Sequence, residues 1–233
     1  MIINVRGAPG SGKSTLVRQF IFGLSTQIGA SVKFEHDPDK KHPILSTYKT
    51  KDISISILGT YEFVLGGCDK VGTLEEVYSL LHKLAEEGRH VVFEGGGTSR
   101  DFEKAFRLHT FLLKQQSELV VLDLNISPNK CMRDIYTRRT TLKEFFIRPP
   151  EGVLRDGYKS IVESDYKTCL RIQKKFISVG IPYHRVGRKE GLNLLFNLFG
   201  LPCHLKDIWG VSVLDLMYFM REHYSGEGSN RLI

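Results

Sequence analysis

The glycine-rich run at residues 7–14 constrains the fold of this chain more than any other feature. It reads Gly-Ala-Pro-Gly-Ser-Gly-Lys-Ser, follows the apolar stretch 2–5 and leads into 14–20, where apolar residues recur at helical spacing. A strand, a glycine loop and a helix in this order predict a phosphate-binding loop, whose backbone N–H groups face the phosphate oxygens. We expect the nucleotide-binding residues to be Gly7, Ala8, Pro9, Gly10, Ser11, Gly12, Lys13, Ser14 and Thr15.

The last residues of this run supply the charge and the metal ligand that a nucleotide needs. Lys13 is placed to bridge the β- and γ-phosphates of ATP, and Ser14 to hold Mg²⁺ through its hydroxyl group. The helix that starts there points the positive end of its dipole at the phosphates. The expected cofactors are therefore ATP and Mg²⁺.

The rest of the chain alternates between short apolar runs and helical patterns. Strands separated by helices predict an α/β three-layer fold, with a mostly parallel central sheet of about five strands and helices on both faces. Residues 53–58 alternate like a half-exposed strand, and Pro182 favours an edge position for the strand at 181–186. The other expected strands are 2–5, 31–35, 90–93 and 119–124.

A magnesium nucleotide also needs an acidic group across from the loop, at the end of a neighbouring buried strand. Glu94 follows the apolar run 90–93 and is the preferred candidate, holding Mg²⁺ through water and bordering the substrate. Asp123 is the alternative, although it lies inside an apolar run and could instead cap the sheet.

Arginines are expected over the transferred phosphate, because its negative charge spreads over its oxygens during transfer. Arg133, Arg138 and Arg139 lie in a predicted helix at 128–139 and suit this role, the alternative being a solvated basic face. We interpret 127–150 as a lid.

The acceptor of the phosphate is less directly indicated. Glu35 and Asp37 end the second strand on the same edge as the loop, and Asp37 is the first choice for the catalytic base, although an Asp-Pro turn explains it equally well. A second cluster could bind the substrate, with Tyr61 stacking on a planar group, Gly67 allowing close approach and Asp69 accepting hydrogen bonds.

Charge and composition narrow the partners. Lys and Arg outnumber Asp and Glu 33 to 26, a net charge of +7, which favours a polyanionic or phosphorylated partner. The four cysteines form no CxxC pair, so neither a zinc site nor a disulfide framework is indicated. No apolar run approaches the ~20 residues of a membrane span, and we expect an intracellular, soluble protein without a membrane partner.

The chain resembles the P-loop kinases of the nucleoside monophosphate kinase group in GAPGSGKST at 7–15, VVFEGG at 91–96 and CMRDIYTRR at 131–139. More narrowly, YEFVLGGCDKV followed by a helix and HVVFEGG is similar to the bacteriophage 5-hydroxymethyluracil DNA kinases. That resemblance implies transfer of the ATP γ-phosphate to the hydroxymethyl group of 5-hydroxymethyluracil in DNA, in the host cytoplasm if the chain is phage-encoded. The resemblance to the P-loop kinases covers residues 1 to about 200, and we interpret 1–200 as the kinase domain. We interpret 201–233 as a C-terminal helical extension and tail, because the apolar residues within 204–224 predict one amphipathic helix.

Three alternatives remain open at this level. A kinase for free deoxynucleoside monophosphates would need an arginine for the substrate phosphate, and a polynucleotide 5′-hydroxyl kinase would act on DNA ends. A non-catalytic ATP-binding switch would keep Lys13 and Ser14 but would need neither a base nor lid arginines.

Overall fold

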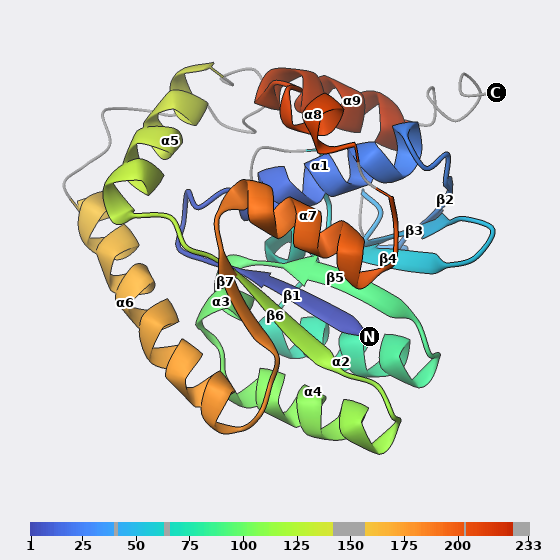
Figure 1. Ribbon diagram of the computed structural model, residues 1–233, viewed down its shortest axis with the longest axis horizontal. Helices are drawn as coiled ribbons and strands as arrows, with labels where there is room; N and C mark the ends of the chain where they lie inside the picture. Colours follow the sequence, from blue (N-terminus) through green and yellow to red (C-terminus); the bar gives the residue numbers. More distant parts are fainter. Residues whose placement is uncertain (40–41, 63–65, 142–156, 203, 226–233) are drawn as a thin grey trace.

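A computed structural model describes residues 1–39, 42–62, 66–141, 157–202 and 204–225. Within these ranges one sheet of seven strands runs in the order β2-β3-β4-β5-β1-β6-β7 (Figure 1). The strands are β1 (Ile2–Arg6), β2 (Ser31–Glu35), β3 (Leu45–Lys49), β4 (Ser54–Leu58), β5 (His90–Glu94), β6 (Leu119–Leu124) and β7 (Tyr183–Val186).

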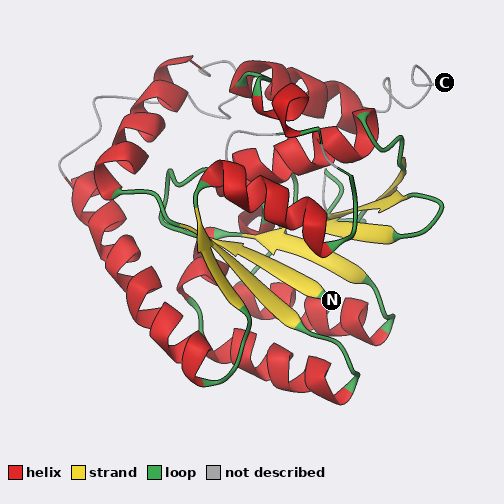
Figure 2. Ribbon diagram, in the orientation of Figure 1, coloured by secondary structure: helices red, strands yellow, loops and turns green. Residues whose placement is uncertain are grey.

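Helices cover both faces of this sheet (Figure 2). One face is packed by α1, α7, α8 and α9, the other by α2 and α4, while α6 runs along the side next to β7. The helices are α1 (Lys13–Thr26), α2 (Leu74–Glu86), α3 (Gly96–Arg100), α4 (Glu103–Lys114), α5 (Pro128–Thr141), α6 (Gly157–Ser178), α7 (Arg188–Leu198), α8 (Leu205–Trp209) and α9 (Val213–Ser225), with a 3₁₀ turn η1 (Cys68–Lys70). None of the helices in the described ranges has both the length and the apolar composition needed to cross a bilayer.

The expected α/β fold with a mostly parallel sheet is confirmed, but the sheet has seven strands, whereas the sequence predicted a sheet of about five and indicated six strand segments in all. Strands β4, β5, β1, β6 and β7 are parallel, and β2 and β3 add an antiparallel extension beyond β4. The unexpected strand is β3, whose residues Leu45, Ser46 and Tyr48 are buried. Its Ser and Thr residues hide the apolar pattern from a reading of the sequence.

Two expectations for individual strands have opposite outcomes. The edge position of the last strand is confirmed, because β7 pairs only with β6 among the strands described. The prediction that 53–58 is half-exposed is wrong, since Ile55, Ser56, Ile57 and Leu58 are all buried. Ser56 is tolerated there because its hydroxyl group shares a hydrogen bond of 3.0 Å with the hydroxyl group of Thr47 on β3.

Helix α2 begins directly after Thr73, which caps it. The Thr73 hydroxyl group accepts a hydrogen bond from the Glu76 N–H at 3.2 Å, and the Glu76 carboxylate accepts one from the Thr73 N–H at 2.6 Å. This reciprocal capping box satisfies two N–H groups that a helix terminus otherwise leaves unpaired. It fixes the end of the loop that runs from β4 through η1.

The C-terminal segment differs from the single helix expected at 204–224. It forms α8 and α9, because α8 ends at Gly210 and Ser212 caps the start of α9, where its hydroxyl group accepts the Asp215 N–H at 3.1 Å. Ile208 and Met220 from these two helices are fully buried in the core that also contains the apolar face of α1. The extension is thus packed against the helix that follows the glycine loop.

Candidate active site

The phosphate-binding loop joins the carboxyl end of β1 to α1. Gly12 precedes α1 with φ 97°, a left-handed conformation that favours glycine, and a Cβ there would lie 2.6 Å from Nε of Arg188. The Gly12 carbonyl accepts the Leu16 N–H at 2.8 Å, which begins the helical ladder. The first N–H groups of α1 have no partner within the helix, so they are available to an anion.

Lys13 lies over this loop. Its Nζ donates to the Gly7 carbonyl at 2.9 Å and to the Ala8 carbonyl at 3.4 Å. A nucleotide phosphate would replace these carbonyls as the partner of the ammonium group. The loop, Lys13 and the start of α1 therefore fit a triphosphate.

Glu94 is the acidic residue expected opposite the loop, and it is hydrogen-bonded to Ser14. The Ser14 hydroxyl group donates to Oε1 of Glu94 at 2.7 Å, and Glu94 is 2% exposed at the end of β5, next to β1. Burial raises the pKa of Glu94, while the Lys13 charge and the Ser14 hydrogen bond oppose that rise. Two oxygen ligands facing a triphosphate loop fit Mg²⁺, which prefers oxygen.

The alternative carboxylate, Asp123, lies elsewhere. It is 2% exposed near the end of β6, on the other side of β1, and its Oδ2 is 3.7 Å from Nε of Arg185. It does not line the cavity over the loop. The geometry therefore supports Glu94, not Asp123, as the acidic group opposite the phosphates.

The buried cation Arg18 interacts electrostatically with Glu94, and it was not identified from the sequence. Its Nε donates to the Tyr61 carbonyl at 2.8 Å, and burial lowers the pKa of Arg18 to about 10, with the Glu94 charge opposing that fall. At neutral pH the guanidinium group is thus charged and balances the carboxylate. The available signal was an arginine between buried positions of α1, such as Val17 and Phe20.

A cavity of about 600 Å³ lies over the loop, within the size range of small-molecule sites. Its floor includes Lys13, Ser14 and Glu94, and its walls come from the loop after β4, from α5 and α6, and from the starts of α7 and α9. The lining residues are Pro9, Gly10, Gly12, Lys13, Ser14, Thr15, Gly66, Asp69, Glu94, Gly96, Asp134, Thr137, Arg138, Thr141, Tyr158, Arg188, Ser212, Val213 and Leu214. Gly7, Ala8 and Ser11 belong to the loop but do not line this space.

Asp69, like Glu94, is a predicted substrate residue that lines the cavity. Both of its carboxylate oxygens accept the Gly96 N–H at 3.0 Å, which fixes the side chain above the end of β5. Asp69 is exposed, unlike Glu94, so lone pairs remain for a ligand. Gly66 lines the same wall.

Gly67 and Tyr61 are placed differently from their predicted roles. A Cβ on Gly67, which has φ 82°, would come within 2.4 Å of Oε1 of Glu94, so this glycine allows close packing on the carboxylate. Tyr61 is fully buried, and its hydroxyl group donates to the Leu58 carbonyl at 3.4 Å. Its ring has no free face for stacking on a planar ligand.

Asp37 and Glu35 lie on the predicted edge of the sheet but away from the cavity. The Asp37 Oδ1 accepts the Asp39 N–H at 3.0 Å, which is the turn that the sequence left open as the alternative. Glu35 pairs with Arg89 at 2.6 Å. Four strand spacings separate β2 from β1, about 19 Å, so neither carboxylate borders the phosphate loop.

The three predicted lid arginines separate into different roles. Arg138 lines the cavity, burial lowers its pKa, and its Nε has no hydrogen-bond partner among the described residues. The Arg139 guanidinium group lies 5.0 Å from the ring centroid of Tyr158, which also lines the cavity. Arg133 is exposed and does not line it. Residues 142–150 of the expected lid lie outside the described residues.

Arg188, at the start of α7, was not predicted. Its Nε donates to the Ser11 carbonyl at 2.7 Å, and its Nη2 donates to the Gly10 carbonyl at 3.0 Å and to Oδ2 of Asp134 at 2.5 Å. These bonds fix the loop and tie it to α5. The available signal was an arginine directly after the last strand, on the same edge of the sheet.

The parallel sheet, the triphosphate loop, the buried Glu94 and the cavity with Asp69 and Arg138 define an ATP-dependent kinase. No family model matches the chain. Over 202 residues it is 31% identical to a protein of Pseudomonas phage PaMx11 named 5-hmdU DNA kinase, covering 84% of this chain and 96% of that protein. The chain belongs to the family of the 5-hmdU DNA kinases.

Proposed function

We propose that this protein transfers the γ-phosphate of ATP to the hydroxymethyl group of 5-hydroxymethyluracil in DNA. The observation that carries the proposal is the alignment with the 5-hmdU DNA kinase, which spans almost the whole of that protein. The cavity supports the proposal, because the predicted phosphate-binding loop and the exposed carboxylate of Asp69 line the same space.

In the proposed reaction, the hydroxymethyl oxygen attacks the γ-phosphorus and the bond from that phosphorus to the β-γ bridging oxygen breaks. Asp69 takes the hydroxyl proton, and ADP leaves with the electron pair of the broken bond. Lys13 and Arg138 stabilise the negative charge that spreads over the transferred oxygens. Mg²⁺, held by Ser14 and Glu94, would neutralise charge on the phosphates.

A base inside a duplex cannot reach such a cavity. The target nucleotide must leave the stack and enter the space over the loop, as in other enzymes that modify bases in DNA. The DNA is therefore proposed as the macromolecular partner, and its phosphates as the polyanion that the +7 charge favours.

The test is to offer γ-labelled ATP and Mg²⁺ with three acceptors in parallel. They are duplex DNA containing 5-hydroxymethyluracil, ordinary duplex with free 5′-hydroxyl ends, and mixed deoxynucleoside monophosphates. We expect label on the modified duplex alone, recovered on the modified nucleoside after digestion. Label on ordinary DNA ends or on free nucleotides would show that the acceptor is one of these and not the modified base.

The same assay tests whether Lys13 takes part in phosphate transfer. We expect Lys13→Ala to lower the transfer rate by about 100-fold or more, because it removes a positive charge from the transferred phosphate. Lys130→Ala, an exposed lysine on α5 that does not line the cavity, is the matched control and should keep the wild-type rate. Equal rates for the two variants would remove Lys13 from the reaction.

A further inference from the structure

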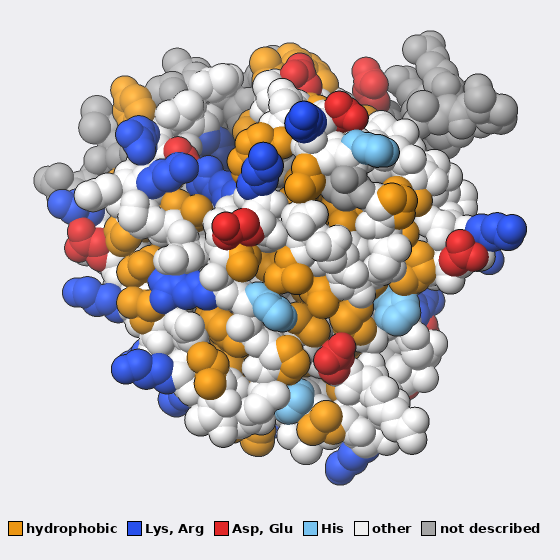
Figure 3. Space-filling model, viewed as in Figure 1, with side chains coloured by type: hydrophobic (Ala, Val, Ile, Leu, Met, Phe, Trp, Pro, Cys, Tyr) orange, Lys and Arg blue, Asp and Glu red, His pale blue; other side chains and the backbone are white. Residues whose placement is uncertain are grey.

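The positive charge of the chain is concentrated on two helices. Together α5 and α6 contain nine Lys and Arg residues and three Asp and Glu residues, a net charge of +6 out of the +7 of the whole chain. In Figure 3 the Lys and Arg side chains gather mainly on the left of the view, where Figure 1 places these helices. Such an asymmetry creates a directed electrostatic field, unlike scattered charges that only aid solubility.

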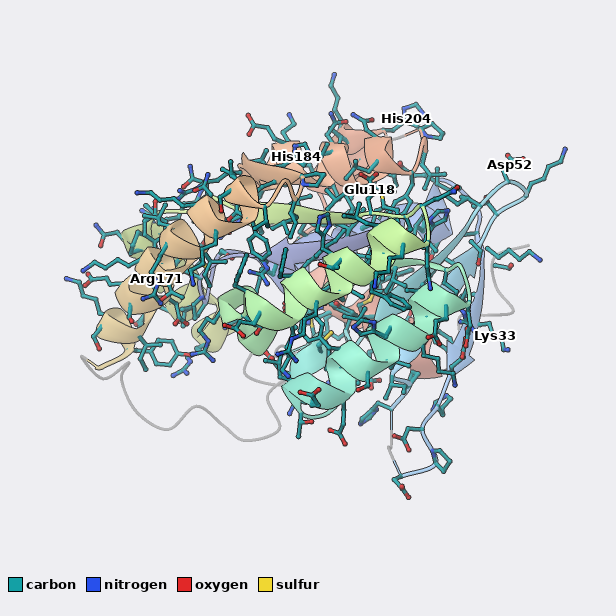
Figure 4. The ribbon with its side chains drawn as sticks, turned by 90° about the horizontal axis from the view of Figure 1, so that it is seen from below. Lys33, Asp52, Glu118, Arg171, His184 and His204 are labelled. Atoms are coloured by element: carbon teal, nitrogen blue, oxygen red, sulfur yellow. The ribbon has the colours of Figure 1, made fainter. Side chains whose placement is uncertain are left out.

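Three of these cations form a stripe along α6. Lys167, Arg171 and Lys174 are exposed and follow one another at spacings of four and three residues, so they share one helix face. Ile172 and Phe176 are buried on the opposite face, which fixes the orientation of the helix. In Figure 4 Arg171 lies on α6, at the left side of the molecule.

The stripe has no internal counter-charge. None of Lys167, Arg171 and Lys174 forms an ion pair with an acidic residue in the described ranges, whereas Lys159 pairs with Glu163 at 3.9 Å. A helix face that served only to solvate the protein would gain from such pairs. The unpaired cations are instead available to an external polyanion.

The helix that carries the stripe begins at the active site, and the stripe itself starts nine residues after Tyr158, at Lys167. Tyr158, in the first turn of α6, lines the cavity, and the helix runs from there for about 24 Å to Lys174. Duplex DNA of that length carries about 14 phosphates. A duplex bound along the stripe would pass the start of α6, where Tyr158 lines the cavity.

We infer that the stripe Lys167, Arg171 and Lys174 on α6 is the surface that binds the phosphate backbone of the DNA duplex flanking the target base. The inference rests on the proposed function only in that the acceptor belongs to DNA. It assigns duplex binding to α6, which lies beside β7 at one end of the sheet.

The test compares two triple variants with the same change in net charge. The α6 variant carries Lys167→Gln, Arg171→Gln and Lys174→Gln, and the control carries Lys33→Gln, Lys83→Gln and Lys114→Gln, all exposed. Binding to a 30-base-pair duplex containing 5-hydroxymethyluracil is measured at several salt concentrations. The α6 variant should lose about tenfold or more in affinity, and its plot of log K against log salt should be shallower by about 3. The control should match the wild type.

Two further readouts separate this inference from the proposed function. Transfer to a trinucleotide containing the modified base should be unchanged in the α6 variant, because that acceptor is too short to reach Lys167. Equal affinities of the α6 and control variants would overturn the inference even if the wild type phosphorylates modified DNA. Conversely, the wild type could transfer no phosphate to modified DNA while the α6 variant still loses affinity for the duplex. That result would contradict the proposed acceptor and support α6 as the DNA-binding surface.

Discussion

Asp69 is the proposed base, because it is exposed and lines the cavity, whereas Glu94 is buried against Ser14 and Asp134 pairs with Arg188. We expect Asp69→Asn to lower kcat by about 100-fold with little change in the affinity for ATP, as removal of a general base does. Asp37→Asn is the control, because that side chain lies in a turn away from the cavity. A large loss of kcat in Asp37→Asn, with none in Asp69→Asn, would return the base to Asp37. Single-turnover transfer and ATP titration measure both quantities.

At the level of single residues, the sequence predicted what depends on local spacing. Lys13, Ser14 and Glu94 are positioned by their own strands and loops, and the structure brings them together. Arg18 and Arg188 were missed because their roles come from packing: Arg18 meets a loop 43 residues away, and Arg188 meets one 177 residues away. A motif marks where a loop lies but not which distant side chain supports it.

Among the elements, α9 is the one whose role the sequence left open. Met217 and Met220 are buried on one face of α9, and Val213 lies on the same face nearer the N-terminus. Val213 is 39% exposed because it faces the cavity. The other end of α9 is docked on β3, where the Tyr48 hydroxyl group lies 2.9 Å from Nε2 of His223. Strand β3 is beside β4, whose following loop carries Asp69, whereas Arg188 follows β7 on the other side of β1. Val213 lines the cavity at the end of α9 opposite to the one docked on β3, and we take it as a candidate contact of the acceptor.

This position leads to a prediction for Val213→Phe. The larger side chain should raise KM for the modified duplex by about tenfold, because a hydrophobic pocket discriminates by a few methylene groups at that level, and leave ATP affinity unchanged. Val211→Phe is the matched control, two residues earlier and outside the cavity lining. Steady-state kinetics with each substrate varied in turn gives both constants. Weaker ATP binding with an unchanged KM for DNA would place α9 beside the nucleotide instead.

The strands and helices that the sequence predicted poorly share a common feature. The parallel strands β5, β1 and β6 are apolar on both faces and were found with nearly correct bounds, because burial on both sides leaves a continuous signal. In β3 and β4, buried Ser46 and Ser56 interrupt that signal, and their hydroxyl groups are satisfied by Tyr224 and Thr47 across the structure. The C-terminal segment divides at Gly210 because Ser212 caps the start of a second helix. Helix propensity alone does not predict whether such a cap or one continuous helix is more stable.

At the scale of the whole molecule, the end of α9 joins the helical layer to the antiparallel side of the sheet. His223 stacks on Tyr48 with ring centroids 5.8 Å apart and also contacts Phe34 and Phe219. The Ser46 hydroxyl group donates to the Tyr224 hydroxyl group at 3.1 Å beside them. Because this contact is buried, the charge state of His223 affects the stability of the folded chain.

Burial lowers the pKa of His223 to about 4 in the folded protein, whereas the unfolded chain has the ordinary value near 6.5. Between these values the unfolded state binds more protons, so acidification from about pH 6.5 to pH 4 should remove up to about 3 kcal/mol of the free energy of unfolding, all of which is present above pH 6.5. Urea unfolding of the wild type and of His223→Gln across this range isolates the contribution, and His36→Gln, at an exposed histidine, should retain the wild-type slope. If stability fell as steeply with acid in His223→Gln as in the wild type, the buried imidazole would not be the group that titrates, and the docking of α9 would be independent of pH.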